Sequence, residues 1–531
     1  MVRSRLLILL WLVSLPAVAQ THRYMVFFKD KTGTPHTVSS PSTFLSPRAL
    51  QRRAKAGASV TNEDLPVTPA YVTQVKATGA KSFFTSRWMN AVLVEASPAQ
   101  LTSIQGLSFV ASTEYVAPGT RLLGGRKASS TTVTATAAAT DDQLGMHGLD
   151  TMHADGYQGT GVLIAVLDSG FPGVDTTIPY EALRSENRIL QEIDFVTNSG
   201  NIYQLDDHGT LILSVMAALS PDFTGGAPSA SYLLYLTEDD ASEYRIEEYN
   251  WLFAAERADS AGADIIQSSV GYATFDDPSM DYTTAMLDGN TAVITRAAAY
   301  ARDRGIIVVA SAGNLGATPW QLISPPADAE GILAVGAVTI TEVKASFSSI
   351  GPTSDGRIKP DVSALGTGVS VILSTGSTGT SNGTSVAAPL VSSLVAGLIE
   401  AYPSKTPNEI IEAIRKSSSR ASGPDNQVGY GIPKYQAVRN YLSQTPPVPE
   451  VSCYPNPVSG NDLWVLFRNP PEGPVTLSVY EMTGRLLETA TTTLTWAENP
   501  FHMDTANLSP GIYLLVMNIG KVRYSFRFVK L

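Results

Sequence analysis

The chain has 531 residues, of which 16% are charged, and a formal net charge of −11 at pH 7. This length predicts three or four domains, and the acidic balance argues against a nucleic-acid partner, which would require a surplus of Lys and Arg. The single cysteine, Cys453, excludes an intrachain disulfide and a cysteine-based zinc cluster. Because Cys453 follows a Pro-rich linker, we interpret it as an ordinary side chain, with a catalytic thiol as the alternative.

The first 19 residues have the features of a secretory signal peptide. Two arginines precede an apolar run from Leu6 to Val13, and the small residues 17–19 form a cleavage motif before Gln20. The apolar run is too short to span a bilayer, and no later stretch has about 18 uninterrupted apolar residues. We therefore expect an exported, soluble protein without a transmembrane segment.

Residues 20–127 are expected to form a small α+β domain. Strand-like runs such as "YMVFF" and "AVLVEA" alternate with helices, one of which begins at Ser46 with Pro47 in its first turn. The following stretch, residues 128–140, reads "ASSTTVTATAAAT" and has little apolar surface to bury. It is expected to be a linker that is open to cleavage.

Residues 141–444 have the pattern of an α/β domain with a doubly wound parallel sheet. Ile246, Tyr249 and Leu252 recur at helical spacing, and Gly262 ends that helix before the apolar run "ADIIQSSVG". The same scheme repeats with Gly305 before "IIVVASAGN". Continuous apolar runs are typical of strands buried on both faces, and functional sites of such sheets lie at the carboxyl ends of the strands.

The remaining residues change in character. Residues 445–452 are a Pro-rich linker, and in residues 453–531 apolar side chains recur at every second position, as in Tyr524, Phe526 and Phe528. This period predicts a separate, β-sandwich-like domain.

Side chains suited to acyl transfer occur at the ends of predicted elements. Asp168 ends the apolar strand "GVLIAVLDSG", and His208 precedes the apolar helix "LILSVMAAL". The other histidines of this domain are His147 and His153. A base and a carboxylate that fixes its tautomer are two requirements of a serine nucleophile. Taken alone, however, a strand-end Asp is more often a cap, and His208 could equally be a solvated loop residue.

The stretch "SNGTSVAAP" supplies a candidate nucleophile, Ser385, at the start of an apolar helix. Gly383 would let a ligand approach the main chain, and the N–H of Ser385 would be one donor to an oxyanion. The side-chain amide of Asn314, at the end of "VVASAGN", would be the second donor. Four such residues at four element ends are unlikely to coincide by chance, and together they favour acyl transfer over mere capping.

These motifs resemble those of the subtilisin-like (S8) serine peptidases: "AVLDSG", "DHGT", "SAGN" and "GTSVAAP", within a similarity of about 300 residues. The resemblance implies that Asp168 orients His208, that His208 is the general base and acid, and that Ser385 attacks a peptide carbonyl while Asn314 stabilises the oxyanion. It also implies that six residues flank the bound peptide: Ser269, Val270, Gly271, Ser311, Ala312 and Gly313. Two departures, residues 211–214 and Val386, affect helix packing and pocket shape rather than reacting groups.

The flanking domains have resemblances of their own. Residues 20–127 resemble the propeptides that assist folding and block the cleft, and residues 453–531 resemble the type IX secretion sorting domain of Bacteroidota. The expected partners are protein or peptide substrates, the chain's own propeptide and the secretion machinery. The expected location is outside the cell or at its surface, after export through the periplasm.

Three alternatives differ from a secreted endopeptidase: an inactive, surface-displayed binding protein on the same scaffold, a sedolisin-type peptidase, and an esterase. No cofactor is required. Structural calcium could bind the acidic loops "TEDD" and "FDDP", although solvated acidic turns are the favoured interpretation. A histidine base with an ordinary pKa of about 6.5 predicts activity that rises through neutral pH and holds into mild alkali.

Overall fold

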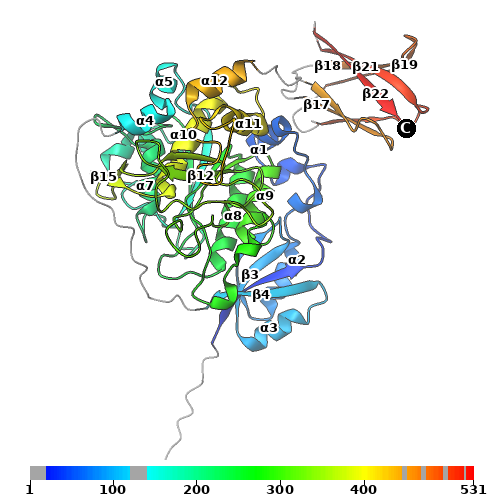
Figure 1. Cartoon of the computed structure of the whole chain (residues 1–531). Coiled ribbons are helices and arrows are strands. Elements are labelled where there is room, and N and C mark those ends of the chain that lie inside the picture. Colours follow the sequence, from blue (N-terminus) through cyan, green and yellow to red (C-terminus); the bar gives the residue numbers. More distant parts are fainter. Residues whose placement is uncertain (1–19, 120–139, 445–450, 468–473, 494–499, 520–521) are drawn as a thin grey trace, which may run out of the picture.

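The computed structural model describes residues 20–119, 140–444, 451–467, 474–493, 500–519 and 522–531 (Figure 1). The expected signal peptide, nearly all of the 128–140 linker and most of the 445–452 linker lie outside these residues. The described chain forms a front α+β unit, drawn in blue, a central α/β unit and a C-terminal β unit, drawn in orange and red.

The central unit is built on a sheet of seven parallel strands in the order β13-β12-β11-β10-β5-β9-β6. All residues of β5, β10 and β11 are buried, as their apolar sequences predict. The fold is therefore the expected doubly wound α/β arrangement. The strands are β5 (Leu163–Asp168), β6 (Ile189–Asp194), β9 (Ser231–Leu236), β10 (Ile265–Ser268), β11 (Ile307–Ser311), β12 (Leu333–Val338) and β13 (Val362–Leu365).

Helices cover both faces of this sheet. Alternate residues of β5 face opposite ways: Ile164 and Val166 join the core beneath α7 and α10, whereas Leu163 and Ala165 join the core beneath α8 and α9. Two short hairpins, β7–β8 (Leu219–Ser220, Phe223–Thr224) and β14–β15 (Val369–Ile372, Thr378–Ser381), lie outside the sheet. The helices are α4 (Asp141–His147), α5 (Leu149–Ala154), α6 (Glu181–Ser185), α7 (His208–Ala217), α8 (Ile246–Ala261), α9 (Val293–Asp303), α10 (Thr384–Ala401), α11 (Pro407–Ser417) and α12 (Tyr435–Gln444).

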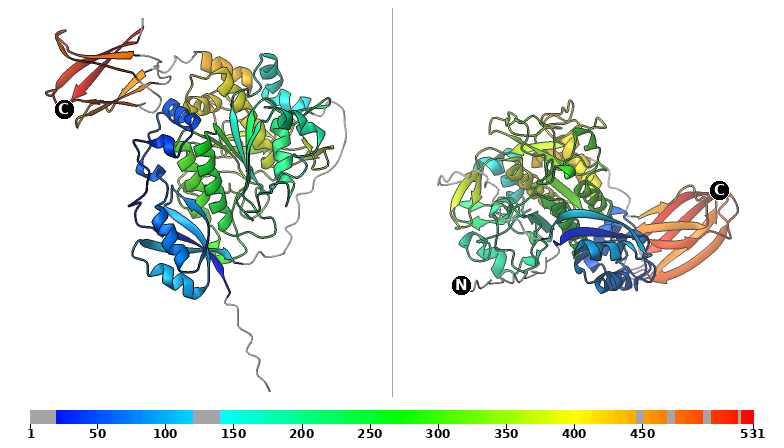
Figure 2. Two further views of the ribbon diagram at one scale, coloured as in Figure 1. Left: turned by 180° about the vertical axis from the view of Figure 1, so that it is seen from behind. Right: turned by 90° about the horizontal axis from the view of Figure 1, so that it is seen from below.

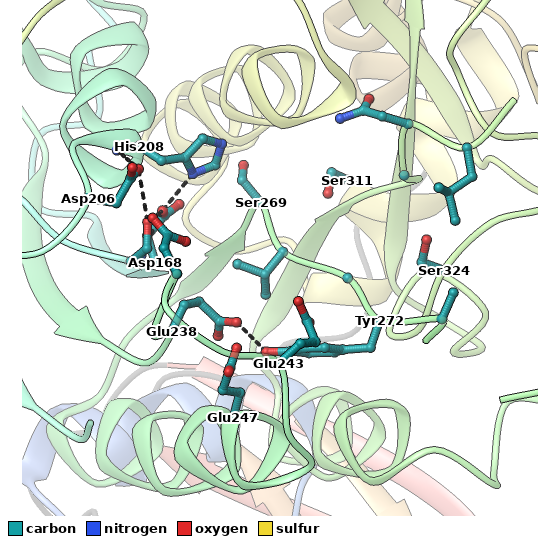
Figure 3. Close-up of a pocket in the computed structure, with 18 of the residues that line it drawn as sticks. Asp168, Asp206, His208, Glu238, Glu243, Glu247, Ser269, Tyr272, Ser311 and Ser324 are labelled. Carbon is teal, nitrogen blue, oxygen red and sulfur yellow. Dashed lines mark hydrogen bonds and ion pairs between the residues drawn. The ribbon is translucent and has the colours of Figure 1, made fainter. Parts of the chain in front are cut away.

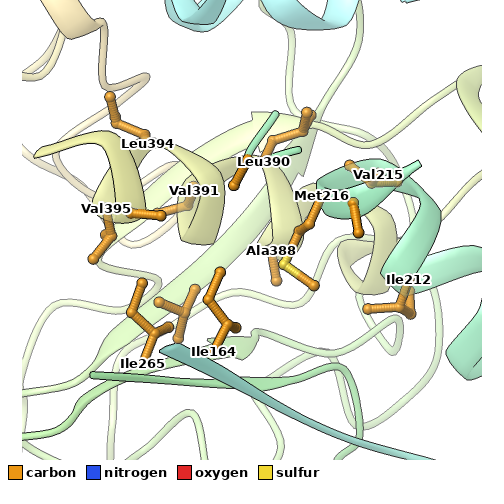
Figure 4. Packing of buried hydrophobic residues seen from close by; sticks show 14 of the residues in the cluster. Ile164, Ile212, Val215, Met216, Ile265, Ala388, Leu390, Val391, Leu394 and Val395 are labelled. Carbon is orange, nitrogen blue, oxygen red and sulfur yellow. The ribbon is translucent and has the colours of Figure 1, made fainter. Parts of the chain in front are cut away.

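Helix α10 runs through the middle of the core (Figure 4). Ala388 and Leu390 pack near Val215 and Met216 of α7, while Val395 approaches Ile265 of β10. Residues 211–214, where the chain departs from the family pattern, are all buried in this contact. Within the described residues α10 is the single helix long and apolar enough to cross a membrane, but 83% of it is buried inside the protein, as expected of a core helix.

The front unit is an antiparallel sheet in the order β2-β3-β1-β4 that lies against the central unit (Figure 2). One sheet face carries Val26 and Val92 into a small core of its own, and the other carries Met25 and Leu93 onto the core of α8 and α9. Ser46 caps the first helix as expected. The elements are β1 (His22–Phe28), α1 (Pro47–Ala56), α2 (Pro69–Ala77), β2 (Lys81–Ser86), β3 (Ala91–Ala96), α3 (Pro98–Gln105) and β4 (Val110–Pro118).

The C-terminal unit is β-rich, as its period-two pattern predicts. Two sheets, β16-β17-β20 and β19-β18-β21-β22, share a core that contains Val465, Leu477 and Leu515. Cys453 is half-buried here, and burial raises the pKa of its thiol to about 12, which disfavours a reactive thiolate. The strands are β16 (Val451–Tyr454), β17 (Asp462–Phe467), β18 (Pro474–Glu481), β19 (Leu486–Thr493), β20 (Phe501–Asp504), β21 (Gly511–Ile519) and β22 (Val522–Lys530).

Candidate active site

A cleft of about 360 Å³ opens at the carboxyl ends of the central strands (Figure 3). Because parallel strands end at one edge of the sheet, side chains from distant parts of the sequence meet there. Asp168 is the last residue of β5, His208 is the first of α7, Asn314 follows β11, and Ser385 lies in the first turn of α10. Asp168, His208 and Asn314 line the cleft itself.

Asp168 and His208 are joined by a hydrogen bond of 2.6 Å between Oδ1 and Nδ1. Asp168 is fully buried, and its Oδ1 also accepts a hydrogen bond of 2.8 Å from the N–H of Ser169. A carboxylate held in this way favours the histidine tautomer with its proton on Nδ1. The other ring nitrogen, Nε2, is then the one that can take a proton.

Carboxylates around His208 change its basicity. Burial lowers the pKa of His208, but the negative charges of Asp168, Asp206 and Asp240 outweigh burial and raise it to about 9. Asp206 also accepts a 2.7 Å hydrogen bond from the main-chain N–H of His208. Burial and the hydrogen bond to Asp206 raise the pKa of Asp240 to about 8. The ordinary pKa expected from the sequence is therefore wrong, because the sequence does not reveal these neighbouring charges.

Ser385 lies at the turn that starts α10. A Cβ atom at Gly383 would lie 2.7 Å from Ser385 Oγ and 3.5 Å from Asn314 Nδ2, so the hydroxyl and the amide lie over the same point of the main chain. Ser385 is 9% exposed. Within the described chain, no hydrogen bond of 3.5 Å or less joins the hydroxyl of Ser385 to His208. The contact between nucleophile and base is often this long in hydrolase sites that hold no substrate.

The main chain of Ser385 is held by an unusual partner. Pro389 lies four residues later and has no N–H to donate to the carbonyl of Ser385, as an ordinary helix would require. Ser269 Oγ donates to that carbonyl instead, at 2.7 Å. The segment that follows β10 is thereby attached to the turn that carries Ser385.

Asn314 is fixed by the residue that precedes Ser385. Its Oδ1 accepts hydrogen bonds from the N–H of Thr384 at 2.9 Å and from the hydroxyl of Thr384 at 3.0 Å. With the oxygen occupied, the amide Nδ2 is the end of Asn314 that is available as a donor. The N-terminus of α10 adds main-chain N–H groups with no helical partner, so this corner of the cleft favours negative charge.

The six residues expected to flank a peptide differ in their surroundings. Ala312 is buried, its N–H donates to Val335, and its side chain packs beneath the cleft rather than lining it. A Cβ at Gly313 would lie 2.6 Å from Ser324 Oγ, so glycine keeps this wall open. Five of the six line the cleft: Ser269, Val270, Gly271, Ser311 and Gly313.

The structure also places acidic residues in the cleft that motif comparison missed. Glu238, Glu243 and Glu247 line it beside Tyr272. The "TEDD" turn was expected to be solvated, but this is wrong for Glu238 and for Asp239, which are both buried. The sequence shows this run of acidic residues, but it does not show that the run lies next to α8 in the folded protein. Among the described residues, no group of three or more His, Cys, Asp or Glu is arranged to hold a metal ion.

Family models match three parts of the chain. The Subtilase family matches residues 159–431, about half of the chain. The Peptidase S8 propeptide domain of Bacteroidota matches residues 23–133, and the Secretion system C-terminal sorting domain matches residues 452–530.

Individual relatives are similar over the central unit. Subtilisin NAT from Bacillus subtilis subsp. natto is 31% identical over 292 residues, covering 54% of this chain and 68% of the relative. Subtilisin from Bacillus pumilus is 30% identical over 292 residues, or 54% of this chain and 94% of the relative. A solved structure, the epidermin leader peptide processing serine protease of Staphylococcus aureus, is similar in fold, with a TM-score of 0.55, 15% identity, and coverage of 79% of this chain and 99% of that one.

Proposed function

The chain belongs to the subtilase family of serine endopeptidases, and we propose that it hydrolyses peptide bonds through an acyl-enzyme intermediate, with Asp168, His208 and Ser385 as the catalytic residues. The observation that carries the proposal is the Asp168–His208 hydrogen bond at a cleft where Ser385 Oγ and Asn314 Nδ2 lie over Gly383. Every group that the mechanism needs is on the chain itself, so it requires no cofactor.

In this mechanism Ser385 Oγ attacks the peptide carbonyl carbon while His208 Nε2 takes the hydroxyl proton. The carbonyl oxygen becomes an oxyanion, which accepts hydrogen bonds from Asn314 Nδ2 and from the N–H of Ser385. When the C–N bond breaks, His208 gives its proton to the leaving amine. Water, activated by His208, then hydrolyses the ester. Asp168 holds the ring and stabilises the imidazolium throughout.

We assign peptide binding to the edges of the cleft. Ser269, Val270 and Gly271 would flank the chain of the substrate on one side, and Ser311 and Gly313 on the other. Ala312 would act through the main chain of this segment, since its side chain is buried.

The flanking units support a zymogen that is exported before it acts. The sorting domain indicates type IX secretion, so the protein is secreted or held at the cell surface. The propeptide domain covers α8 and α9 next to the cleft, and we propose that Ser385 removes it after folding. Its substrates would be proteins or peptides outside the cell.

The test compares the wild type with Ser385→Ala, both expressed without residues 1–19. We expect the wild type to lose about its first 120 residues, to digest casein and to react with a fluorophosphonate probe, while Ser385→Ala stays full-length, inert and unlabelled. Ser404→Ala, a change of an exposed serine, is the matched control and should behave as the wild type. A folded wild type that neither labels nor cleaves would favour the inactive binding scaffold instead.

A further inference from the structure

The cleft is strongly acidic at one end. Among the described residues that line it there are seven carboxylates and no Lys or Arg. Three of the carboxylates, Glu238, Glu243 and Glu247, gather with Tyr272 beneath the segment that follows β10 (Figure 3). We call these four residues the acidic pocket.

The fold buries the acidic pocket although its members are charged residues. Glu238 follows β9, Glu243 lies in the loop before α8, Glu247 lies in the first turn of α8, and Tyr272 follows Gly271. The three glutamates are 7%, 6% and 3% exposed, respectively. Carboxylates are rarely buried to this degree unless a positive group balances them.

Hydrogen bonds satisfy only part of the pocket. Glu238 accepts from the hydroxyl of Tyr272 and, at 2.9 Å, from that of Thr237. Oε1 of Glu247 is buried and has no hydrogen-bond partner among the described residues. An unpartnered oxygen in a cavity wall points to a donor that is absent when the cleft holds no ligand.

The electrostatics favour a cation as this donor. Burial raises the pKa of Glu238 and of Glu247, and in Glu247 the charges of Glu238 and Glu243 add to the effect of burial. A side-chain hydrogen bond in which Glu247 is the donor and Glu238 the acceptor raises the pKa of Glu247 further, so a proton partly offsets the negative charge of the pocket. An ammonium or guanidinium group would relieve the remaining repulsion between these carboxylates and supply several N–H donors at once.

The last described residues of the front unit lie close to the acidic pocket. Its last strand, β4, ends at Pro118, and a second cavity is lined by Pro118, Gly119 and Glu247 together with Asp239 and Ser242. Glu247 lines both cavities. Glu247 therefore connects the cavity at the last described residues of the front unit with the cleft that holds the catalytic groups.

The sequence that follows β4 is complementary in charge. Arg121, Arg126 and Lys127 occur within the first eight residues after Gly119, and no Asp or Glu occurs before Asp141. These cations stand directly before the 128–140 linker, where we expect the propeptide to be cut, and so on the N-terminal side of that cut.

We propose that the acidic pocket binds an Arg or Lys side chain of the substrate, on the N-terminal side of the bond that is cleaved. The inference rests on the proposed function and specifies its substrate class: peptides with a basic residue upstream of the scissile bond. The chain's own segment after Gly119 would be the first such substrate.

The experiment uses the processed enzyme and internally quenched peptides of one neutral sequence. Each peptide carries Arg, Lys, Gln, Leu or Glu at the second, third or fourth position before the scissile bond. At one position we expect kcat/KM for Arg or Lys to exceed that for Gln at least about tenfold, with Glu the poorest. In Glu247→Gln and Glu243→Gln this ratio should fall several-fold, whereas in Glu412→Gln, an exposed change on α11, it should not.

Two results would overturn the inference: equal kcat/KM for Arg and Leu at all three positions, or a basic preference that is unchanged in both pocket variants. Labelling of Ser385 by a fluorophosphonate separates the two proposals, because a labelled enzyme without basic preference refutes the pocket alone. If no peptide is cleaved and Ser385 does not label, the proposed function fails. In that case, fluorescence anisotropy measures the affinity of the same protein for labelled Arg and Gln peptides. Equal affinities would refute the proposal that the acidic pocket binds a basic side chain.

Discussion

The carboxylate of Asp206 accepts a hydrogen bond from the main-chain N–H of His208, two residues further along the chain. The base of the site is thus held between two carboxylates, since Asp168 binds its ring. Both charges favour the protonated histidine, and the pKa of His208 rises to about 9. A histidine must be unprotonated to act as a base, so these contacts govern the pH at which the site works.

The first prediction concerns pH. We expect kcat/KM of the processed enzyme to rise with pH with a midpoint near 9, because below its pKa His208 is largely protonated. Asp206→Asn keeps an acceptor for the N–H but removes a charge, so the rise should move to lower pH by about 0.5 to 1 unit. Profiles of kcat/KM measure this, with the exposed Asp222→Asn as control. A rise centred near pH 6.5 in the wild type would contradict it.

Asn314→Ala should lower kcat about 10² to 10³-fold, the loss typical of removing one oxyanion donor in this family. The reason is that Nδ2 contributes mainly when the carbonyl oxygen becomes negative. Steady-state kinetics on a peptide amide test this. An effect confined to KM would mean that Asn314 binds the substrate but does not stabilise the transition state.

The contact between Ser269 and Ser385 is the third test. Ser269→Ala leaves the carbonyl of Ser385 without its 2.7 Å donor, while Pro389 prevents a helical replacement. We expect a loss of about 1 to 3 kcal/mol in the free energy of unfolding and a lower kcat, since the turn of Ser385 is no longer held. Ser269→Thr, which keeps the hydroxyl, should recover most of both. Unchanged denaturation and kinetics in Ser269→Ala would show that the hydroxyl is not needed.

The fourth prediction concerns the contact between the front unit and the central unit. Asp259 of α8 is fully buried and forms ion pairs with Arg52, Arg53 and Arg87 of the front unit. Burial alone would raise the pKa of Asp259, but the three guanidinium groups outweigh burial and hold it well below its usual range. Asp259→Asn removes the charge that the three cations share, leaving Arg53 with Asp64 alone, at a cost of about 3 to 5 kcal/mol. The cleaved propeptide should therefore dissociate about 10² to 10⁴-fold more readily.

Gel filtration of the processed protein at decreasing concentration measures how much propeptide remains bound. Asp303→Asn, an exposed change on α9, is the control. Acid should act in the same direction: a carboxylate with a depressed pKa stabilises the contact above its ordinary pKa of about 4, and the stabilisation is lost as the pH falls further. Equal retention in both variants would show that Asp259 does not hold the propeptide.

Much of the site was predictable because its residues stand at element ends with strong local signals. Asp168 closes an apolar strand, and His208 and Ser385 begin apolar helices, so the sequence alone indicated which edge of the sheet they share. The sandwich was predictable for a similar reason, since alternation at Tyr524 and Phe528 is a property of one strand.

The charges around these residues were not predictable, because they come from tertiary contacts. Nothing local in "TEDD" indicates that Glu238 is buried against Tyr272, or that Glu247 reaches it from α8. The raised pKa of His208 likewise depends on Asp240, which lies more than thirty residues away in the sequence and approaches only in the folded protein. Periodicity reports which face of an element is buried, but it does not report which charges meet.

The position of Ser385 on α10 determines when during folding the catalytic site can form. That helix rests on β10, β11, β12 and β13, so its first turn is set only after the sheet has assembled beneath it. Before the sheet has assembled, Asp168, His208 and Ser385 are separated by long stretches of sequence. The triad therefore cannot form in the unfolded chain, and peptidase activity should appear only once the central unit has folded.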